Sequence, residues 1–335
     1  MAATYRFLDL SELRDPDQPR QIFALDVLMG LSARPKRLPS RYFYDDEGSR
    51  IFQRITELPE YYLTGAEREI FERHGGEIAR GLSSEPFDLV ELGPGDGRKT
   101  RILLQSFQKA GLDFRYVPID ISESAISGLA RSLEAGFPGL EVCGLVSEYF
   151  SALQWLNRER RRRTLVLFSG SNIGNFSRPE SLVFLRSLWN SLNDDDLVLI
   201  GFDLKKDVDV MLRAYNDSRG VTRDFSLNLL RRINRELGGD FDLERFRFFS
   251  TYDVLMGSMN SYLLSLNRQT VSISFIGQAF AFEPWEPIQT EYSYKYLESD
   301  ICGLAAETGF EAAAWYFDSR RFFTSSLWRV RKRVG

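Results

Sequence analysis

The stretch FDLVELGPGDGRKT, residues 87–100, decides the fold class of this chain. Its first part, Phe87–Leu92, is short and largely apolar, as expected of a strand that is buried on both faces. Three glycines follow within GPGDG, residues 93–97, and an amphipathic stretch, Lys99–Ala110, comes directly after them. The sequence therefore predicts a strand, a tight loop and a helix in succession, which is the repeating unit of a parallel α/β sheet.

The same alternation continues on the C-terminal side of this unit. Further apolar runs are expected to form strands, with helices between them. The predicted strands are Tyr116–Ile121, Leu140–Val146, Thr164–Phe168 and Leu197–Asp203, and the predicted helices include Ser122–Leu133 and Pro179–Leu192. This repetition predicts a doubly wound, mainly parallel sheet that is covered by helices on both faces.

The last two apolar runs of the chain are expected to pair differently. Glu311–Phe317 and Phe322–Val330 are separated only by residues 318–321, which is too short a connection for a parallel crossover. We therefore predict an antiparallel hairpin at the edge of the sheet. Five parallel strands followed by such a hairpin resemble the plan of a class I, Rossmann-like methyltransferase domain.

Two segments do not fit this sheet and are expected to form a second, smaller α+β domain. They are residues 1–65 and residues 206–294, and the sheet domain then comprises residues 66–205 and 295–335. Within the second segment, Val208–Tyr215 and Phe225–Leu237 have helical patterns. Ser258–Leu266 and Thr270–Phe282 are predicted to form the two arms of one hairpin. We expect this smaller domain to bind the substrate.

Composition excludes several classes of function. The 335 residues include 43 basic and 47 acidic side chains, so the net charge of −4 gives no general field for nucleic acids. The chain has one histidine, His74, and two cysteines, Cys143 and Cys302, which are too few for a disulfide framework or a His/Cys metal cluster. His74 precedes two glycines in a charged stretch that is typical of a helix end rather than a cleft, which argues against a Ser-His-Asp or Cys-His hydrolase. No apolar run of 18 residues is present. We expect a cytoplasmic monomer without a metal, nucleic-acid or membrane partner.

The glycine loop carries the first chemical signal. Gly93, Gly95 and Gly97 allow a tight turn close to a ligand, and Asp120 ends the next strand, where a carboxylate can accept hydrogen bonds from both ribose hydroxyls. These features predict a bound nucleoside. Position 98 holds arginine where a dinucleotide fingerprint needs glycine, and the acidic Glu91 precedes the loop, so S-adenosylmethionine is favoured over NAD. The full predicted cofactor site is Glu91, Gly93, Gly95, Gly97, Lys99, Asp120 and Ser171, and a glycine-rich turn without a ligand is the alternative.

A second polar cluster follows the fourth predicted strand. Residues 168–176 read FSGSNIGNF, which places Asn172 and Asn175 just beyond a strand end. Ligands of open α/β sheets bind outside the carboxyl ends of the strands, so both asparagines are candidates to meet a methyl acceptor. Asparagine and glycine are also ordinary turn residues, and this remains the alternative.

Six collinear motifs carry a resemblance to a known family. They are RYFYDDEGS at 41–49, LPEYYLT at 58–64, ELGPGDGRKT at 91–100, PIDIS at 118–122, GSNIGN at 170–175 and TEYSYK at 290–295. Together they resemble the histidine-specific N-α-methyltransferase family of ergothioneine biosynthesis. The resemblance extends from about Leu38 to the C-terminus. It implies methyl transfer from S-adenosylmethionine to the α-amino group of histidine, with hercynine and S-adenosylhomocysteine as products.

The resemblance also implies roles for individual residues. Tyr44 is expected at the α-amine, where it would act in catalysis by orienting the lone pair. Three residues are expected on the substrate carboxylate, namely Tyr61, Asn175 and Tyr215. Glu291 and Ser293 would hold the imidazole nitrogens. A neutral imidazole presents one donor and one acceptor, which a carboxylate beside a hydroxyl can satisfy.

One departure from the family concerns the side-chain pocket. The family often places a methionine against the imidazole, and the matching position here holds Ser261. A second hypothesis therefore keeps the chemistry but changes the acceptor to another α-amino acid, such as a tryptophan derivative. A third hypothesis is a nucleoside-binding protein without methyl transfer.

Overall fold

A computed structural model describes residues 5–9, 18–82, 85–134, 136–158 and 162–332. These residues form two compact units. The first unit contains the described residues of 1–13, 63–205 and 296–335, and the second contains those of 14–62 and 206–295. The chain therefore leaves the first unit after Lys205 and returns to it at Tyr296.

The first unit is built on one eight-stranded sheet. Its strand order is β1-β5-β4-β3-β6-β7-β14-β13. Neighbouring strands from β1 to β7 in this order are parallel, whereas β14 pairs antiparallel with both β7 and β13. The strands are β1 (Tyr5–Asp9), β3 (Phe87–Leu92), β4 (Phe114–Asp120), β5 (Glu141–Val146), β6 (Arg163–Phe168), β7 (Leu197–Asp203), β13 (Phe310–Phe317) and β14 (Phe323–Val330).

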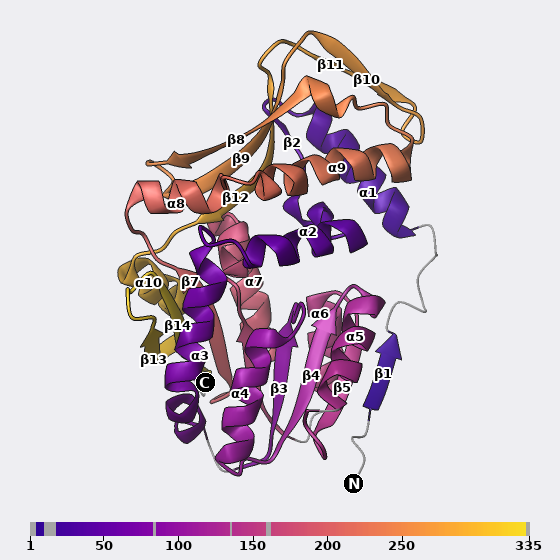
Figure 1. Cartoon of the computed structure of the whole chain (residues 1–335). Helices are drawn as coiled ribbons and strands as arrows, with labels where there is room; N and C mark the ends of the chain where they lie inside the picture. The colour runs from indigo at the N-terminus through magenta and orange to yellow at the C-terminus, as the bar shows by residue number, and fades with distance from the viewer. Residues whose placement is uncertain (1–4, 10–17, 83–84, 135, 159–161, 333–335) are drawn as a thin grey trace. The chain divides into compact units, whose positions relative to one another are not determined.

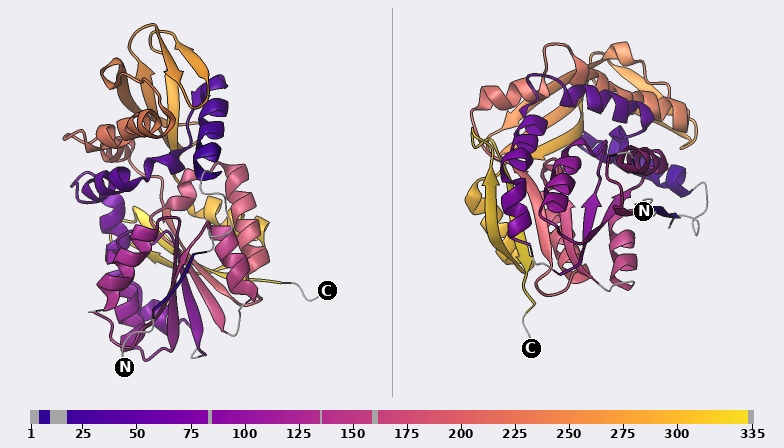
Figure 2. Two further views of the ribbon diagram at one scale, coloured as in Figure 1. Left: turned by 90° about the vertical axis from the view of Figure 1, so that its right-hand side faces the viewer. Right: turned by 60° about the horizontal axis from the view of Figure 1, so that its bottom comes forward.

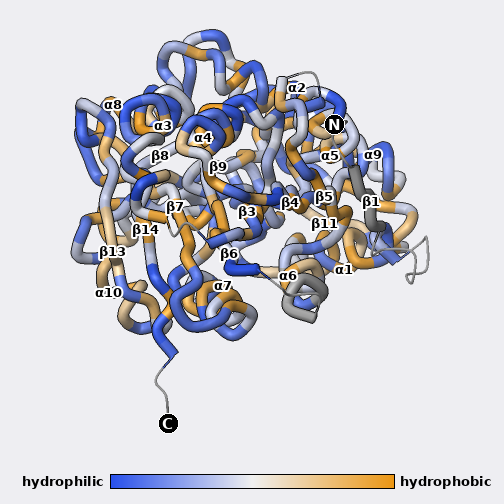
Figure 3. The backbone as a smooth tube through the Cα atoms, turned by 90° about the horizontal axis from the view of Figure 1, so that it is seen from below, coloured by the Kyte–Doolittle hydropathy of each residue, from blue (hydrophilic) through white to orange (hydrophobic). Residues whose placement is uncertain are grey.

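Helices cover both faces of this sheet, as the left view of Figure 2 shows. They are α3 (Tyr62–Arg80), α4 (Arg98–Lys109), α5 (Glu123–Glu134), α6 (Tyr149–Arg158), α7 (Arg178–Ser191) and α10 (Glu298–Thr308). Helix α4 illustrates why they pack here, because Thr100, Leu103, Leu104 and Phe107 recur at helical spacing and are its buried residues. In Figure 3 these helices carry both hydrophobic and hydrophilic stretches, as expected of helices with one buried side.

The expected sheet is confirmed, including its five parallel strands and the terminal antiparallel hairpin. The N-terminal segment differs from the prediction, because residues 1–65 do not all belong to the second unit. Tyr5–Asp9 forms β1, which pairs in parallel with β5. An added strand pairs the backbone groups that an edge strand would otherwise leave open. Its pairing partner lies more than a hundred residues away in sequence, so no local pattern indicates it.

The second unit combines helices with two small sheets (Figure 1). A four-stranded sheet has the order β2-β12-β9-β8, and β10 and β11 form a separate pair. The strands are β2 (Lys36–Arg37), β8 (Phe246–Asp253), β9 (Ser258–Ser265), β10 (Gln269–Ile273), β11 (Gln278–Phe282) and β12 (Pro287–Tyr294). The helices are α1 (Gln18–Ser32), α2 (Asp46–Thr56), α8 (Val208–Tyr215) and α9 (Val221–Leu237). One apolar core joins them and includes Phe43, Leu229, Leu263 and Ile288.

The predicted hairpin between Ser258–Leu266 and Thr270–Phe282 is wrong. Strand β9 pairs with β8 and β12 instead. The stretch 270–282 is not one arm, because it reverses at Gly277, whose φ is +68°, and its two halves pair with each other. Buried and exposed residues do alternate along both β10 and β11, but the turn that separates them lies within the stretch.

Candidate active site

The loop between β3 and α4 has the backbone that its glycines allow. Gly93, Gly95 and Gly97 have φ values of +69°, +58° and +68°, which side-chain-bearing residues rarely adopt. A β-carbon added at Gly97 would lie 2.2 Å from Leu129 Cδ1, so this glycine lets α5 approach. A β-carbon added at Gly95 would meet no atom within 4 Å. The backbone at Gly95 therefore borders open space that a ligand can approach closely.

Asp120 lies at the carboxyl end of β4, next to this loop in the sheet order. Its Oδ1 accepts a hydrogen bond from the backbone N–H of Ser122 at 2.9 Å, and within the described residues no cation pairs with it. Burial raises the pKa of Asp120, against the effect of backbone hydrogen bonds. A partly desolvated carboxylate without a cationic partner is well suited to accept hydrogen bonds from two ribose hydroxyls. The loop and Asp120 thus fit the nucleoside part of S-adenosylmethionine.

Glu91 is inside the first unit and is bonded on both sides. Its Oε1 accepts a hydrogen bond from Thr100 Oγ1 at 2.6 Å, and its Oε2 accepts one from the Tyr116 hydroxyl. Burial raises the pKa of Glu91 to about 7, although these hydrogen bonds and the charge of Lys99 oppose the shift. Glu91 holds the base of the loop to α4 and β4, and its contact with the cofactor stays a prediction.

A buried carboxylate that the sequence analysis missed pairs with Lys99. Glu67 on α3 is 1% exposed, forms an ion pair with Lys99 Nζ and accepts hydrogen bonds from the backbone N–H of Gly170 at 2.9 and 3.0 Å. A signal for it was present in the sequence. Glu67 lies on the apolar stripe of α3, between the buried Leu63 and Ile70 at helical spacing.

The residues after β6 form a tight connection. Ser171 adopts a φ of +58°, and its hydroxyl accepts a hydrogen bond from the backbone N–H of Asp203 at 3.1 Å. The predicted cofactor residue Ser171 therefore joins the ends of β6 and β7. Residues Asn172–Asn175 form one turn of 3-10 helix, and both asparagines are partly exposed. Both asparagines belong to the first unit, whereas the other residues predicted to bind the methyl acceptor belong to the second.

Tyr149, at the start of α6, is a second residue that the sequence analysis missed. A β-carbon added at Gly93 would lie 2.7 Å from its hydroxyl. Burial raises the pKa of Tyr149, and the nearby carboxylates of Asp120 and Glu91 raise it further. The tyrosine is thus held close to the glycine loop as a neutral phenol. A single tyrosine at a helix start carries no signal in the sequence that would have indicated this.

Two predicted substrate-binding residues, Tyr215 and Ser293, meet Lys295 in the second unit. The Tyr215 hydroxyl donates to Ser293 Oγ at 2.8 Å, and Lys295 Nζ donates to both, at 2.8 Å and 2.9 Å. All three side chains are buried. Because Ser293 Oγ accepts from both neighbours, its own hydroxyl proton is left to donate elsewhere. Tyr215 was expected on the substrate carboxylate, and its proton is directed at Ser293 in this structure.

Glu291 and Ser261 are direct partners in the pairing of β12 with β9, and Ser293 faces Met259 in the same ladder. Direct partners of an antiparallel pair project to the same face, so these four side chains share one face of the sheet. Burial raises the pKa of Glu291 to about 7, although the charge of Lys295 opposes the shift. A methionine is therefore present on this face, beside Ser293 rather than opposite Glu291.

The same face continues onto β8. Ser250 is the direct partner of Ser261, and its buried hydroxyl has no hydrogen-bond partner in the part of the chain that the structure describes. In the other direction along the strands, the next pair, Leu263 and Ile288, belongs to the apolar core. The face thus changes from apolar to polar at the row of Ser261 and Glu291.

The two aromatic segments of the N-terminal part also come together. The ring of Phe52 contacts both Tyr44 and Tyr61 edge-on, with centroids 5.5 and 6.3 Å apart. Tyr44 is 36% exposed and also contacts Phe225 of α9. Tyr44 is predicted at the α-amine of the substrate and Tyr61 at its carboxylate. The structure places both tyrosines in one aromatic cluster around Phe52.

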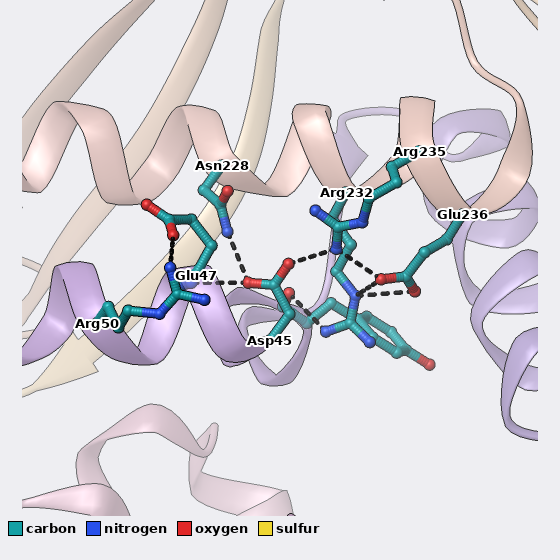
Figure 4. A network of polar contacts seen from close by, with 9 residues as sticks. Asp45, Glu47, Arg50, Asn228, Arg232, Arg235 and Glu236 are labelled. Carbon is teal, nitrogen blue, oxygen red and sulfur yellow. Dashed lines mark hydrogen bonds and ion pairs between the residues drawn. The ribbon is translucent and has the colours of Figure 1, made fainter.

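Asp45 fixes the segment that carries Tyr44, as Figure 4 shows. It caps α2 by accepting from the backbone N–H of Gly48 at 2.7 Å. It also accepts from Asn228 at 2.8 Å and from Arg235 at 2.5 Å, both on α9. Partial burial opposes the shift, but these hydrogen bonds lower the pKa of Asp45. An ionised carboxylate thus connects the start of α2 to α9.

Within the described residues, no three potential metal ligands gather in one place. Over the same residues, no helix has the length and apolar character needed to cross a membrane.

A parallel sheet that ends in an antiparallel hairpin, with a glycine loop between β3 and α4 and an acidic residue ending the next strand, defines a class I S-adenosylmethionine-dependent methyltransferase. The sequence profile described as "Histidine-specific methyltransferase, SAM-dependent" matches residues 23–330. The chain belongs to this family.

Similarity to individual proteins agrees with that membership. The chain is 34% identical to the histidine N-alpha-methyltransferase of Mycolicibacterium smegmatis, over 96% of this chain and 98% of that protein. It is 35% identical to the histidine N-alpha-methyltransferase of Mycobacterium tuberculosis, over 90% of this chain and 93% of that protein. It is also 29% identical to a 4-dimethylallyltryptophan N-methyltransferase of Claviceps purpurea, over 84% of this chain and 88% of that protein.

Proposed function

We propose that this chain transfers methyl groups from S-adenosylmethionine to the α-amino group of L-histidine, giving hercynine as a step of ergothioneine biosynthesis. The two relatives named for histidine, each at about one-third identity over most of both chains, support this acceptor. In this proposal the second unit binds the amino acid, and the glycine loop with Asp120 binds the cofactor.

The observation that carries the proposal is the arrangement of Glu291 and Ser293 on β12. Ser293 Oγ accepts hydrogen bonds from Tyr215 and Lys295, which leaves its proton to be donated to the unprotonated ring nitrogen of histidine. The Glu291 carboxylate accepts from the ring N–H. One donor and one acceptor thus meet the two nitrogens of a neutral imidazole. An aliphatic or phenyl side chain would leave both protein groups unpaired.

The chemical step needs an oriented neutral amine more than it needs acid–base groups. When bound, S-adenosylmethionine supplies an electrophilic methyl group on a sulfonium sulfur. Tyr44 orients the amine lone pair, and Tyr61 and Asn175 hold the carboxylate, so that the α-carbon is fixed. Tyr215 acts instead through Ser293, to which it donates its proton. A free α-amine loses its proton at mildly alkaline pH, and a neighbouring positive charge lowers that pKa further. Positioning supplies most of the rate.

A second acceptor class is favoured by one observation. The small Ser261 is the direct partner of Glu291, and the unpartnered hydroxyl of Ser250 lies next to it on β8. An α-amino acid with a larger ring, such as a tryptophan derivative, would use the space over Ser261. The relative named for 4-dimethylallyltryptophan is in line with this alternative.

Product analysis with single substrates tests the proposal. Purified protein is incubated with S-adenosylmethionine and either histidine or histidine methyl ester, and the products are followed by mass spectrometry and NMR. We expect histidine to gain methyl groups on the α-nitrogen only, up to three. The methyl ester lacks the carboxylate charge and should react poorly. Methylation of a ring nitrogen, or equal turnover of the ester, would refute the assignment.

A further inference from the structure

Glu67 connects two parts of the first unit whose relative position matters for methyl transfer: the start of α4 and the segment after β6. Its carboxylate reaches Lys99, in the first turn of α4 directly after the glycine loop, and the backbone N–H of Gly170, at the start of the segment that contains Ser171 and Asn175. Glu67 itself belongs to α3. One carboxylate on a third element therefore links the cofactor side of the unit to the acceptor side.

The surroundings of this carboxylate are tight. A β-carbon added at Gly201 on β7 would lie 2.4 Å from Glu67 Oε1, so the glycine provides the space that the carboxylate occupies. The residue is 1% exposed. Isolating a charge from water is costly unless it is paired and fully hydrogen-bonded, and here Lys99 and Gly170 supply those partners. Such a group is held rigidly, and it holds its partners rigidly in turn.

Lys99 keeps hydrogen-bonding capacity beyond this pair. An ammonium group has three donors, and the described ion pair uses only part of them. The Lys99 side chain is 23% exposed, in contrast to its carboxylate partner, so the ammonium also faces space outside the protein interior. S-adenosylmethionine carries one carboxylate, on its amino-acid part, and this is the cofactor group that a lysine ammonium suits.

We propose that Glu67 is a positioning residue: it orients Lys99 toward the carboxylate of the methyl donor and holds the Gly170–Asn175 segment at the acceptor side. It touches neither ligand. Its loss leaves the nucleoside contacts at the glycine loop and Asp120 in place but lets Lys99 and the Gly170 backbone move. The proposal uses the predicted donor contact of Lys99 and does not depend on which amino acid is the acceptor.

Binding of two nucleosides separates this role from general damage. S-adenosylhomocysteine carries the amino-acid part, whereas methylthioadenosine has the same adenosine and thioether sulfur without it. We expect Glu67→Gln to weaken S-adenosylhomocysteine about tenfold by calorimetry, the size of one lost charge-assisted hydrogen bond. Methylthioadenosine affinity should stay unchanged. Gly201→Ala, which pushes the carboxylate away without removing it, should give the same pattern if it folds.

A matched control is offered by Asp88 on β3. It is 3% exposed and pairs with Arg115 at 3.0 and 2.8 Å, so it is also a buried carboxylate with a cationic partner, but at the start of the strand whose end leads into the loop. Asp88→Asn should change thermal stability and leave the ratio of the two affinities unchanged. An unchanged ratio in a folded Glu67→Gln variant, or a tighter S-adenosylhomocysteine complex, would overturn the proposal. Equal weakening of both nucleosides would also overturn it.

Turnover measurements test the second part of the proposal, namely that Glu67 holds the Gly170–Asn175 segment in place. With saturating donor and the best amino-acid substrate of the wild type, Glu67→Gln should lower kcat about tenfold or more, because the Gly170–Asn175 segment loses its fixed position. If the wild type turns over another amino acid but not histidine, the proposed acceptor fails while this test still stands. If kcat is unchanged in the variant, the acceptor arm is wrong whatever the acceptor.

Discussion

Glu291→Gln is the substitution that tests the electrostatics of the acceptor site most directly. Burial raises the pKa of Glu291 from an ordinary 4.5 to about 7. The folded protein therefore binds more protons at this side chain than the unfolded chain does between these pH values. The stability that the protonated Glu291 contributes at low pH is therefore lost as the pH rises from 4.5 through about 7. Glutamine has nearly the same shape and does not titrate, so it removes this pH dependence.

The size of the effect follows from the two pKa values. At about 1.4 kcal/mol for each pH unit, the interval from 4.5 to 7 corresponds to about 3 kcal/mol of unfolding free energy, most of which falls between pH 5 and pH 8. Relative to the wild type, Glu291→Gln should thus gain about 2–3 kcal/mol of unfolding free energy between pH 5 and pH 8. Denaturant unfolding of both proteins at several pH values measures the difference, and Glu91, whose pKa is also raised to about 7, cancels between them. A difference that stays flat from pH 5 to pH 8 would refute the reasoning.

The remaining predictions concern the cofactor loop and the acceptor carboxylate. Asp120→Asn should weaken S-adenosylhomocysteine by about 1.5–3 kcal/mol in calorimetry, and unchanged affinity in the folded variant would remove Asp120 from the site. Gly97→Ala should cost more stability than Gly95→Ala, because both glycines have positive φ but only the former also meets Leu129, at 2.2 Å. Gly95→Ala should instead lose more cofactor affinity, and the reverse order in unfolding and binding experiments would contradict the open space assigned to Gly95. Asn175→Ala should raise the KM for histidine with little change in thermal stability; a variant with wild-type KM would place the substrate carboxylate elsewhere.

Local sequence patterns were sufficient for the parallel sheet. The strands from Phe87 to Asp203 are short, largely apolar runs, because both of their faces are covered by helices, and the helices between them carry an apolar stripe. The short connection between β13 and β14 was likewise enough to predict their antiparallel pairing. For the strand–loop–helix units and for this hairpin, the residues that determine the local structure lie close together in the sequence.

Pairings between distant segments could not be predicted in this way. Tyr5–Asp9 joins a strand that lies beyond residue 140, and β12 selects β9 rather than its nearer neighbour β11. The second choice depends on apolar side chains such as Leu263 and Ile288, which only become neighbours in the folded core. Side-chain alternation shows that a strand forms, but not which strand it pairs with.

In the candidate site, too, residues placed by local patterns could be predicted, whereas contacts between distant segments could not. The glycine loop and Asp120 follow from local patterns, since both are placed by the ends of adjacent strands. The contacts of Ser293 with Tyr215 and Lys295 became visible only in the structure, because Tyr215 is 78 residues away from Ser293 in sequence. Glu67 was open to prediction as an acidic residue on an apolar stripe, whereas Tyr149 was not.

A competition experiment shows whether histidine is the methyl acceptor. The protein is incubated with S-adenosylmethionine and an equimolar mixture of the twenty amino acids, and all methylated products are quantified by mass spectrometry at low conversion. We expect methylated histidine to exceed any methylated phenylalanine or leucine by several orders of magnitude, because phenylalanine and leucine leave Glu291 and Ser293 unpaired. Faster methylation of tryptophan or another bulky amino acid than of histidine would contradict it and would assign the site to the larger ring.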